Sequence, residues 1–256
     1  MIKQIWAKEI KAELYTWKST VWLVIASLLF SFTSYLLLTN KELSLLDQTE
    51  LLWLLGKIII GAAFLIVSID ASSIITTEFE KETAESLFLS PLSFKDFLVG
   101  KFLASLTLWA MVYVVAVPYI LVASSGSNLA VPFLAHVLLL GTLGIAGLIL
   151  VVFAISLLFR TMKNTLTTSL VILLAFTIPA LFSSTLKNNG VAENFSRINP
   201  VDNIFSSLDN VLVDYQTSIL QNAKYLLPII IFCFAGLLLL VFAAKRFQKD
   251  GVIKND

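Results

Sequence analysis

Six stretches of about twenty consecutive apolar residues most constrain what this chain can fold into. They cover residues 21–38, 52–75, 102–123, 133–159, 166–186 and 225–244. A bilayer hydrocarbon core about 30 Å thick requires about 20 residues of α-helix to cross it. Because the stretches are continuously apolar and do not alternate, they predict helices and not the strands of a barrel. We therefore expect an all-α membrane protein with six transmembrane helices.

The composition supports a single membrane domain spanning residues 1–256. With 58% hydrophobic and 14% charged residues, a water-soluble globule would expose too much apolar surface. The net charge of +1 predicts no binding to nucleic acid, and a single cysteine excludes an intramolecular disulfide. The sequence also lacks a Walker-type phosphate loop, paired metal-binding histidines and a nucleophile elbow. We expect no enzyme activity and no cofactor on this chain.

The distribution of lysine and arginine predicts the orientation. If the N-terminus is cytoplasmic, most of the 18 basic residues fall on the inner side, and only Lys41, Lys57, Lys187, Arg197 and Lys224 fall outside. The positive-inside rule then places both termini in the cytoplasm of a multi-pass cell-membrane protein, which we expect to be bacterial. The segment 1–18 alternates apolar residues with lysines at nearly helical period and predicts an amphipathic helix on the inner lipid surface, or docked on protein. Residues 187–224 are expected to form an outer loop.

The connector between the second and third apolar stretches predicts a short cytoplasmic helix over residues 77–90. Thr77 is a candidate N-cap, Glu78, Glu82 and Glu85 share one face, and Pro91 ends the helix. We interpret this acidic helix as a docking element for a cytoplasmic partner. The alternative is a solvated connector.

Several polar residues interrupt the apolar stretches. Ser27, Ser31 and Ser34 lie on one face of the first stretch and either bond to a neighbouring helix or line a polar path. Asp70 lies 13 positions from Lys57, so the two charges occupy nearly opposite faces. Lys57 is expected to extend to the outer headgroups, whereas Asp70 is either a hydrogen-bonded carboxylate between helices or a proton- or ion-coupling site. His136, the only histidine, is expected to be packed or interfacial rather than a proton relay.

The connector resembles that of type-2 (ABC-2 type) ABC exporter permeases. Their loop between the second and third spans has charged residues, then Gly-Thr-x-Glu, leucines, Ser/Thr-Pro and a later Gly-Lys. This chain has the same features in the same order. Glutamate replaces the glycine, and phenylalanine replaces a basic residue that is common in the family. The matching and replaced positions are Glu78, Phe79, Glu80, Lys81, Glu82, Thr83, Ala84, Glu85, Leu87, Leu89, Ser90, Pro91, Gly100 and Lys101. The resemblance extends to the six spans, the N-terminal helix and the outer loop with Asn199, Pro200 and Val201.

The resemblance implies a permease subunit without its own ATPase. Two copies would pair, as a homodimer or a heterodimer with a related permease, and bind two copies of a cytoplasmic ABC ATPase that carries ATP and Mg. The implied ATPase-coupling residues are Glu78, Glu80, Lys81, Glu82, Thr83, Ala84, Glu85, Leu87 and Phe88. In such exporters the first, second and fifth spans border the transport path, which implies a lining role for the serine stripe and for Thr168 and Ser169 in the fifth stretch.

We therefore predict the permease of an ATP-driven exporter in contact with membrane lipids. Mostly apolar spans with hydroxyl groups and few charges favour an amphipathic or hydrophobic substrate: a peptide such as an antimicrobial or toxin peptide, a drug or a lipid. Two alternatives remain. One is an ion- or proton-coupled secondary transporter that uses Asp70, and the other is a membrane immunity or sensor module that transports nothing.

Overall fold

The computed structural model describes residues 6–8, 11, 17–39, 48–81, 93–125, 127–181, 190–212 and 219–251. Within those ranges the chain is almost wholly helical and contains no strand. Six of the helices are long and apolar enough to cross a bilayer. The predicted all-α membrane fold and the predicted number of spans are therefore confirmed.

The helices enclose five of the six predicted spans and extend them into polar sequence, whereas the helix of the fifth predicted span ends at Leu181 and residues 182–186 of that span lie outside the described residues. The six spans are α2 (Trp17–Thr39), α3 (Gln48–Glu80), α5 (Phe94–Ala123), α6 (Ala130–Phe159), α7 (Met162–Leu181) and α10 (Ile219–Gly251). Two shorter helices, α8 (Gly190–Ile198) and α9 (Pro200–Leu212), separate α7 from α10 along the chain. α5 begins well before the predicted residue 102 because Ser93 caps it, its hydroxyl accepting the Asp96 N–H at 3.1 Å.

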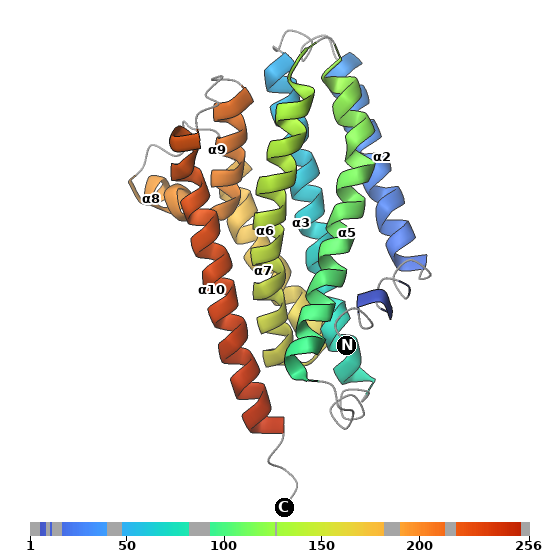
Figure 1. Ribbon diagram of the computed structural model, residues 1–256, viewed down its shortest axis with the longest axis vertical. Coiled ribbons are helices and arrows are strands. Elements are labelled where there is room, and N and C mark those ends of the chain that lie inside the picture. The colour runs from blue at the N-terminus through green and yellow to red at the C-terminus, as the bar shows by residue number, and fades with distance from the viewer. Residues whose placement is uncertain are drawn as a thin grey trace, which may run out of the picture.

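The spans run alternately up and down one bundle (Figure 1). α2 begins and α10 ends at the same end of the bundle as the connection between α3 and α5. This arrangement agrees with two termini on one side of a membrane, although the cytoplasmic assignment of that side stays a prediction. Most of the predicted interfacial helix 1–18 lies outside the described residues. Within it, the indole N–H of Trp6 donates to the Thr107 hydroxyl of α5 at 3.1 Å.

α3 and α6 form the centre of the bundle, whereas α2, α7 and α10 expose most of their apolar surface. Close packing around α6 depends on its glycines. A Cβ at Gly141 would lie 2.6 Å from the Trp109 ring of α5. Similarly, a Cβ at Gly236 of α10 would lie 3.0 Å from the backbone oxygen of Gly147. Small residues thus bring α5 and α10 against α6, as is common between membrane helices.

The predicted outer loop 187–224 is not simply a loop, because α9 is inserted among the spans. Nearly all side chains of α9 are buried, and it contacts α3, α6, α7 and α10. Ile204 of α9 reaches Gly144 of α6, which lies roughly 21 Å along that helix from its start. At that depth a helix end must satisfy its backbone groups within the protein.

Asn199 provides that satisfaction at the start of α9. Its side-chain oxygen accepts the Val201 N–H at 3.0 Å, as an N-cap residue does. Its amide Nδ2 donates to the Phe176 carbonyl of α7 at 2.7 Å, next to the helix turn that Pro179 disturbs. One asparagine therefore caps α9 and bonds to a carbonyl of α7 three residues before Pro179.

We expect Gly141→Ala to lower the melting temperature of the purified chain in detergent. Trp109 is 2% exposed, and its indole N–H donates to the Thr142 hydroxyl at 2.9 Å. Displacing the ring to make room for a new methyl group would therefore cost free energy. Overpacking of this kind costs about 1 to 3 kcal/mol. Gly61→Ala is the matched control, because nothing lies within 4 Å of a Cβ at Gly61. Equal melting temperatures for the two variants would contradict the packing argument.

Candidate functional site

The last turn of α3 contacts three other helices through three consecutive residues. Glu78, Phe79 and Glu80 project in different directions because successive residues are rotated by about 100° around a helix. Glu78 pairs with Lys101 of α5, Phe79 packs against Phe247 of α10, and Glu80 binds the start of α7. We call this set the junction, and define it as Glu78, Phe79, Glu80, Phe94, Lys101, Arg160, Met162 and Phe247.

An ion pair between Glu78 and Lys101 joins the end of α3 to α5. The Lys101 Nζ lies 2.9 Å from Glu78 Oε1 and 5.3 Å from the centre of the Phe97 ring. Lys101 is only 2% exposed, and an ammonium group without a partner in such a place would cost several kcal/mol. The carboxylate of Glu78 supplies that partner. Because Lys101 follows the connector and Glu78 precedes it, the ion pair joins the two helices on either side of the connector.

Glu80 binds the beginning of α7. One of its carboxylate oxygens accepts the backbone N–H of Met162, the first residue of α7, at 2.7 Å. The first N–H groups of a helix have no partner within that helix, and the positive end of the helix dipole favours a negative charge there. Glu80 therefore acts as an N-terminal cap supplied by another helix.

Aromatic rings connect the junction to α10. The ring centres of Phe79 and Phe247 are 5.2 Å apart, and Phe94 stacks on Phe247 at 5.5 Å. The Arg160 guanidinium lies 4.9 Å from the Phe247 ring centre. Arg160 ends α6 in the left-handed conformation with φ of 57°, which turns the chain directly into α7. In Figure 1 these helix ends gather at the lower end of the bundle.

The predicted start of the coupling helix is wrong. Thr77 does not cap a new helix, because α3 continues through it and its hydroxyl donates to the Ser73 carbonyl at 2.6 Å. Threonine forms this bond to the carbonyl four residues earlier inside helices. Glu78 and Glu80 therefore belong to the end of the second span, and Lys81 is an exposed turn residue. The remaining predicted coupling residues lie outside the described residues: Glu82, Thr83, Ala84, Glu85, Leu87 and Phe88.

The predicted path-lining residues of α7 lie against α3 in this single chain. Ser169 is 1% exposed, and Ser72 of α3 donates to its hydroxyl at 3.4 Å. Thr168 is half-buried beside it. The hydroxyls of Ser68 and Thr165 are also buried and have no hydrogen-bond partner. The packing of α3 on α7 is thus unusually rich in hydroxyl groups, several of which are poorly satisfied.

The serine stripe of α2 faces three different surroundings. Ser27 shares a hydrogen bond with the Tyr119 hydroxyl of α5 at 2.8 Å. Ser31 is exposed, and Ser34 is 6% exposed with a hydroxyl that lacks a partner. Ser27 thus performs the interhelical bonding that was one of the two readings of the stripe. A lining role for the stripe stays a prediction.

The two intramembrane charges of α3 lie far apart, as their spacing requires. Asp70 is 6% exposed, within the core of the bundle. The Lys57 ammonium lies 3.3 Å from the centre of the Trp53 ring and 5.6 Å from that of Phe205 in α9. Aromatic faces stabilise a cation in a partly desolvated place. Lys57 therefore binds aromatic rings in the first half of α3, where simple extension toward headgroups was expected.

Residue types alone do not reveal the partners in the junction. Glu78, Glu80 and Lys101 were recognisable from the connector pattern, but Arg160, Met162 and Phe247 were not. A lysine at the start of an apolar stretch was the available signal that a carboxylate must lie nearby. Among the residues that the structure describes, no three histidine, cysteine, aspartate or glutamate side chains form a potential metal site.

Comparison with known families agrees with the geometry. A family model described as "ABC-2 family transporter protein" matches residues 33–245. This range runs from within α2 to within α10 and includes every junction residue except Phe247. No curated protein matches the sequence.

The ion pair between Glu78 and Lys101 generates a prediction about stability. Glu78→Gln and Lys101→Met are each expected to lower the free energy of unfolding by about 1 to 3 kcal/mol, because each leaves one charge without its partner. The double variant should cost less than the sum of the single variants. The measurement is denaturant unfolding in detergent, with Lys95→Gln as an exposed control on the same helix. Strictly additive costs would show that the two side chains do not interact.

Proposed function

The chain belongs to the ABC-2 family of transporter proteins, and from this premise we propose that it is the permease subunit of an ATP-driven exporter. The energy comes from a separate cytoplasmic ATPase, which binds ATP and Mg. The observation that carries this proposal is the junction. A permease without a motor needs a place where external force enters its spans, and the end of α3 contacts α5, α7 and α10 at once.

The connector 81–93 is the docking element for the ATPase. It joins the end of α3 to the start of α5, two helices that are also held together by the ion pair of Glu78 and Lys101. Because α3 is continuous through Glu80, a push on the connector acts on the whole length of the second span. The second span therefore transmits the force, and the connector is the segment to which the ATPase applies it.

Glu80 and Phe79 distribute that push. Through Glu80 the load reaches the first turn of α7, and through Phe79 and Phe247 it reaches the last turns of α10. α7 packs on α3 through hydroxyl groups that include unsatisfied ones. Such an interface loses few bonds when it slides, which suits two helices that change their relative position during transport.

The assembly we propose contains two permease copies and two ATPase copies. A second copy of this chain or a related permease would cover the apolar side chains that α2 and α7 expose, such as Phe32, Tyr35, Val171 and Ile178. The path would lie between the copies, where Ser31 and Thr168 are accessible, whereas Ser34 and Ser169 are buried within each chain and would reach the path only after α2 or α7 moves. An amphipathic or hydrophobic peptide, drug or lipid suits walls with hydroxyl groups and few charges.

Cross-linking to the motor provides the direct test. The chain is co-expressed with candidate ABC ATPases, and single cysteines replace Glu82 and Glu85. We expect both positions to form cross-links with the ATPase, and Glu85→Lys to weaken co-purification. If neither cysteine forms a cross-link with a nucleotide-hydrolysing subunit and the two proteins do not co-purify, the proposal is wrong.

The junction variants separate assembly from force transmission. We expect Glu80→Ala and Phe79→Ala to co-purify with the ATPase as the unmodified chain does, and to lower permease-dependent ATP turnover in proteoliposomes. Loss of a charge-assisted hydrogen bond of about 1.5 kcal/mol corresponds to roughly a tenfold change. Lys95→Gln, an exposed residue at the same end, should leave turnover unchanged. Unchanged turnover in both junction variants would exclude this route of transmission.

The nature of the energy source distinguishes the exporter from a secondary transporter that uses Asp70. In the proposed exporter, a mutation that inactivates ATP hydrolysis in the partner abolishes transport. Asp70→Asn retains the shape of a side chain that is 6% exposed and should leave transport dependent on ATP. Transport that survives ATPase inactivation and fails with Asp70→Asn would identify ion coupling instead.

A further inference from the structure

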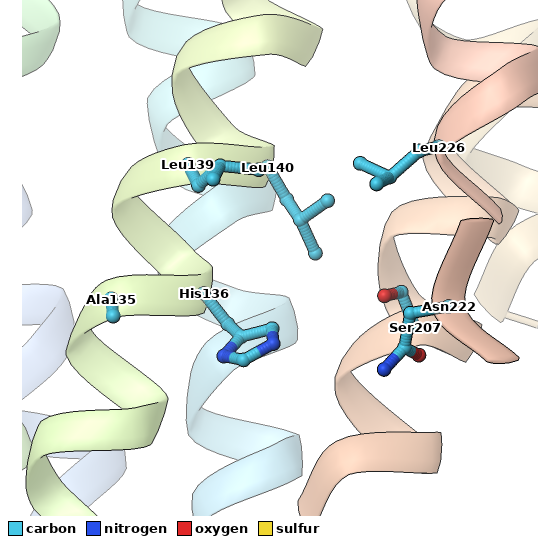
Figure 2. A pocket seen from close by; sticks show the side chains of 7 residues that line it. All are labelled: Ala135, His136, Leu139, Leu140, Ser207, Asn222 and Leu226. Atoms are coloured by element: carbon cyan, nitrogen blue, oxygen red, sulfur yellow. The ribbon is translucent and has the colours of Figure 1, made fainter. Parts of the chain in front are cut away.

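A second site lies at the opposite end of the bundle from the junction. α6, α9 and α10 enclose a cavity of about 310 Å³, lined by Ala135, His136, Leu139, Leu140, Ser207, Asn222 and Leu226. Its volume is at the lower end of the range of about 300 to 1,000 Å³ that is usual for small-molecule sites. Figure 2 shows His136 on α6 directed across the cavity toward Ser207 and Asn222.

The hydrogen bond of His136 fixes what it offers to the cavity. Its Nδ1 lies 2.8 Å from the Pro132 carbonyl, one turn earlier on α6. A carbonyl only accepts hydrogen bonds, so Nδ1 carries the proton, and in the neutral imidazole Nε2 is an acceptor. The ring edge that carries Nε2 faces away from the backbone of α6. His136 therefore presents an acceptor to a ligand hydroxyl.

The opposite wall carries complementary groups. Ser207 of α9 supplies a hydroxyl, which both donates and accepts. The Asn222 side chain of α10 is oriented by Asn210, whose Nδ2 donates to Asn222 Oδ1 at 3.1 Å. The amide Nδ2 of Asn222 is then the donor of that side chain. Three polar groups from three helices thus converge on one end of a cavity between membrane spans.

The rest of the lining is apolar and uncharged. Leu139, Leu140, Leu226 and Ala135 form the walls, and among the described residues no aspartate, glutamate, lysine or arginine lines the cavity. A charged headgroup placed there would lose its hydration without gaining a counter-charge. The lining therefore selects a neutral, hydroxyl-bearing head and a hydrocarbon chain.

The position of the cavity indicates the route by which a ligand arrives. Ala135 and Leu139 are exposed, so the cavity opens on the outer surface of the bundle, which faces lipid in a membrane. His136 lies near the start of α6 and Asn222 near the start of α10. The polar groups are therefore within reach of the membrane interface, where lipid hydroxyl and glycerol groups lie.

We propose that this cavity binds a neutral, hydroxyl-bearing lipid from the bilayer. The head binds His136, Ser207 and Asn222, and the upper part of the chain lies against Leu139 and Leu226. The site is separate from the junction and does not depend on the exporter assignment. It adds a specific lipid ligand to a protein whose proposed motor binds at the other end.

A photoactivatable monoacylglycerol with a diazirine in its chain tests the proposal. The purified full-length chain in phosphatidylcholine nanodiscs is labelled and the attachment sites are mapped by mass spectrometry. We expect labelling on residues 135–140 and 222–226, and competition by unlabelled 1-monooleoylglycerol. Methyl oleate, which has no hydroxyl, and oleate, which is charged, should compete at least about tenfold less well, since each lacks matched hydrogen bonds.

Two leucines of α6 provide matched variants. Leu139 is 53% exposed and lines the cavity, whereas its neighbour Leu138 is 45% exposed and does not. Leu139→Trp should fill the opening and abolish specific labelling, and Leu138→Trp should leave it unchanged. Ser207→Ala should weaken competition by 1-monooleoylglycerol about fivefold through loss of one hydrogen bond. Equal labelling of the two tryptophan variants, or equal competition by methyl oleate, would overturn the proposal. Neither measurement involves ATP.

Discussion

The bilayer provides no water for backbone hydrogen bonds, and this constraint governs the whole structure. It explains the six continuous helices, and it also explains how a shorter helix is tolerated at membrane depth. The start of α9 is satisfied within the bundle because Asn199 caps it and at the same time bonds to the Phe176 carbonyl of α7. Further bonds from Asn203 to the carbonyls of Ser196 and Arg197 complete the turn between α8 and α9.

The same constraint makes the junction rigid. A lysine that is 2% exposed and the first N–H of α7 are both costly to leave unpaired, and two glutamates of one helical turn satisfy them. Of the two contacts, the ion pair of Glu78 with Lys101 is partly buried and the bond of Glu80 to Met162 is exposed. The two glutamates therefore stabilise the packing of the end of α3 against α5 and α7.

The length and hydropathy of each apolar stretch were sufficient to predict the spans, because a long apolar stretch in a membrane protein has few stable structures other than a transmembrane helix. They were insufficient for α9, whose polar residues read as a loop until Asn199, Asp202 and Asn203 are seen bonded inside the bundle. Thr77 was wrongly predicted to be an N-cap, because a hydroxyl that can cap the start of a helix can also bond to a carbonyl within a helix. The partners of Lys101 and Glu80 lie 23 and 82 residues away in sequence, and only tertiary packing brings them together.

α10 connects the two ends of the molecule. Its last turns hold Phe247 in the junction, and its first turns hold Asn222 beside the cavity. Contact between Gly236 and the Gly147 backbone, together with the Cys233 thiol donating to the Leu143 carbonyl at 3.1 Å, joins α10 to α6 along the middle of both helices. Close-packed elements of this kind move as a unit, since sliding would cost their contacts. The junction and the cavity are therefore joined through one close-packed pair of helices, and α9, which supplies the Ser207 wall of the cavity, packs against both members of that pair.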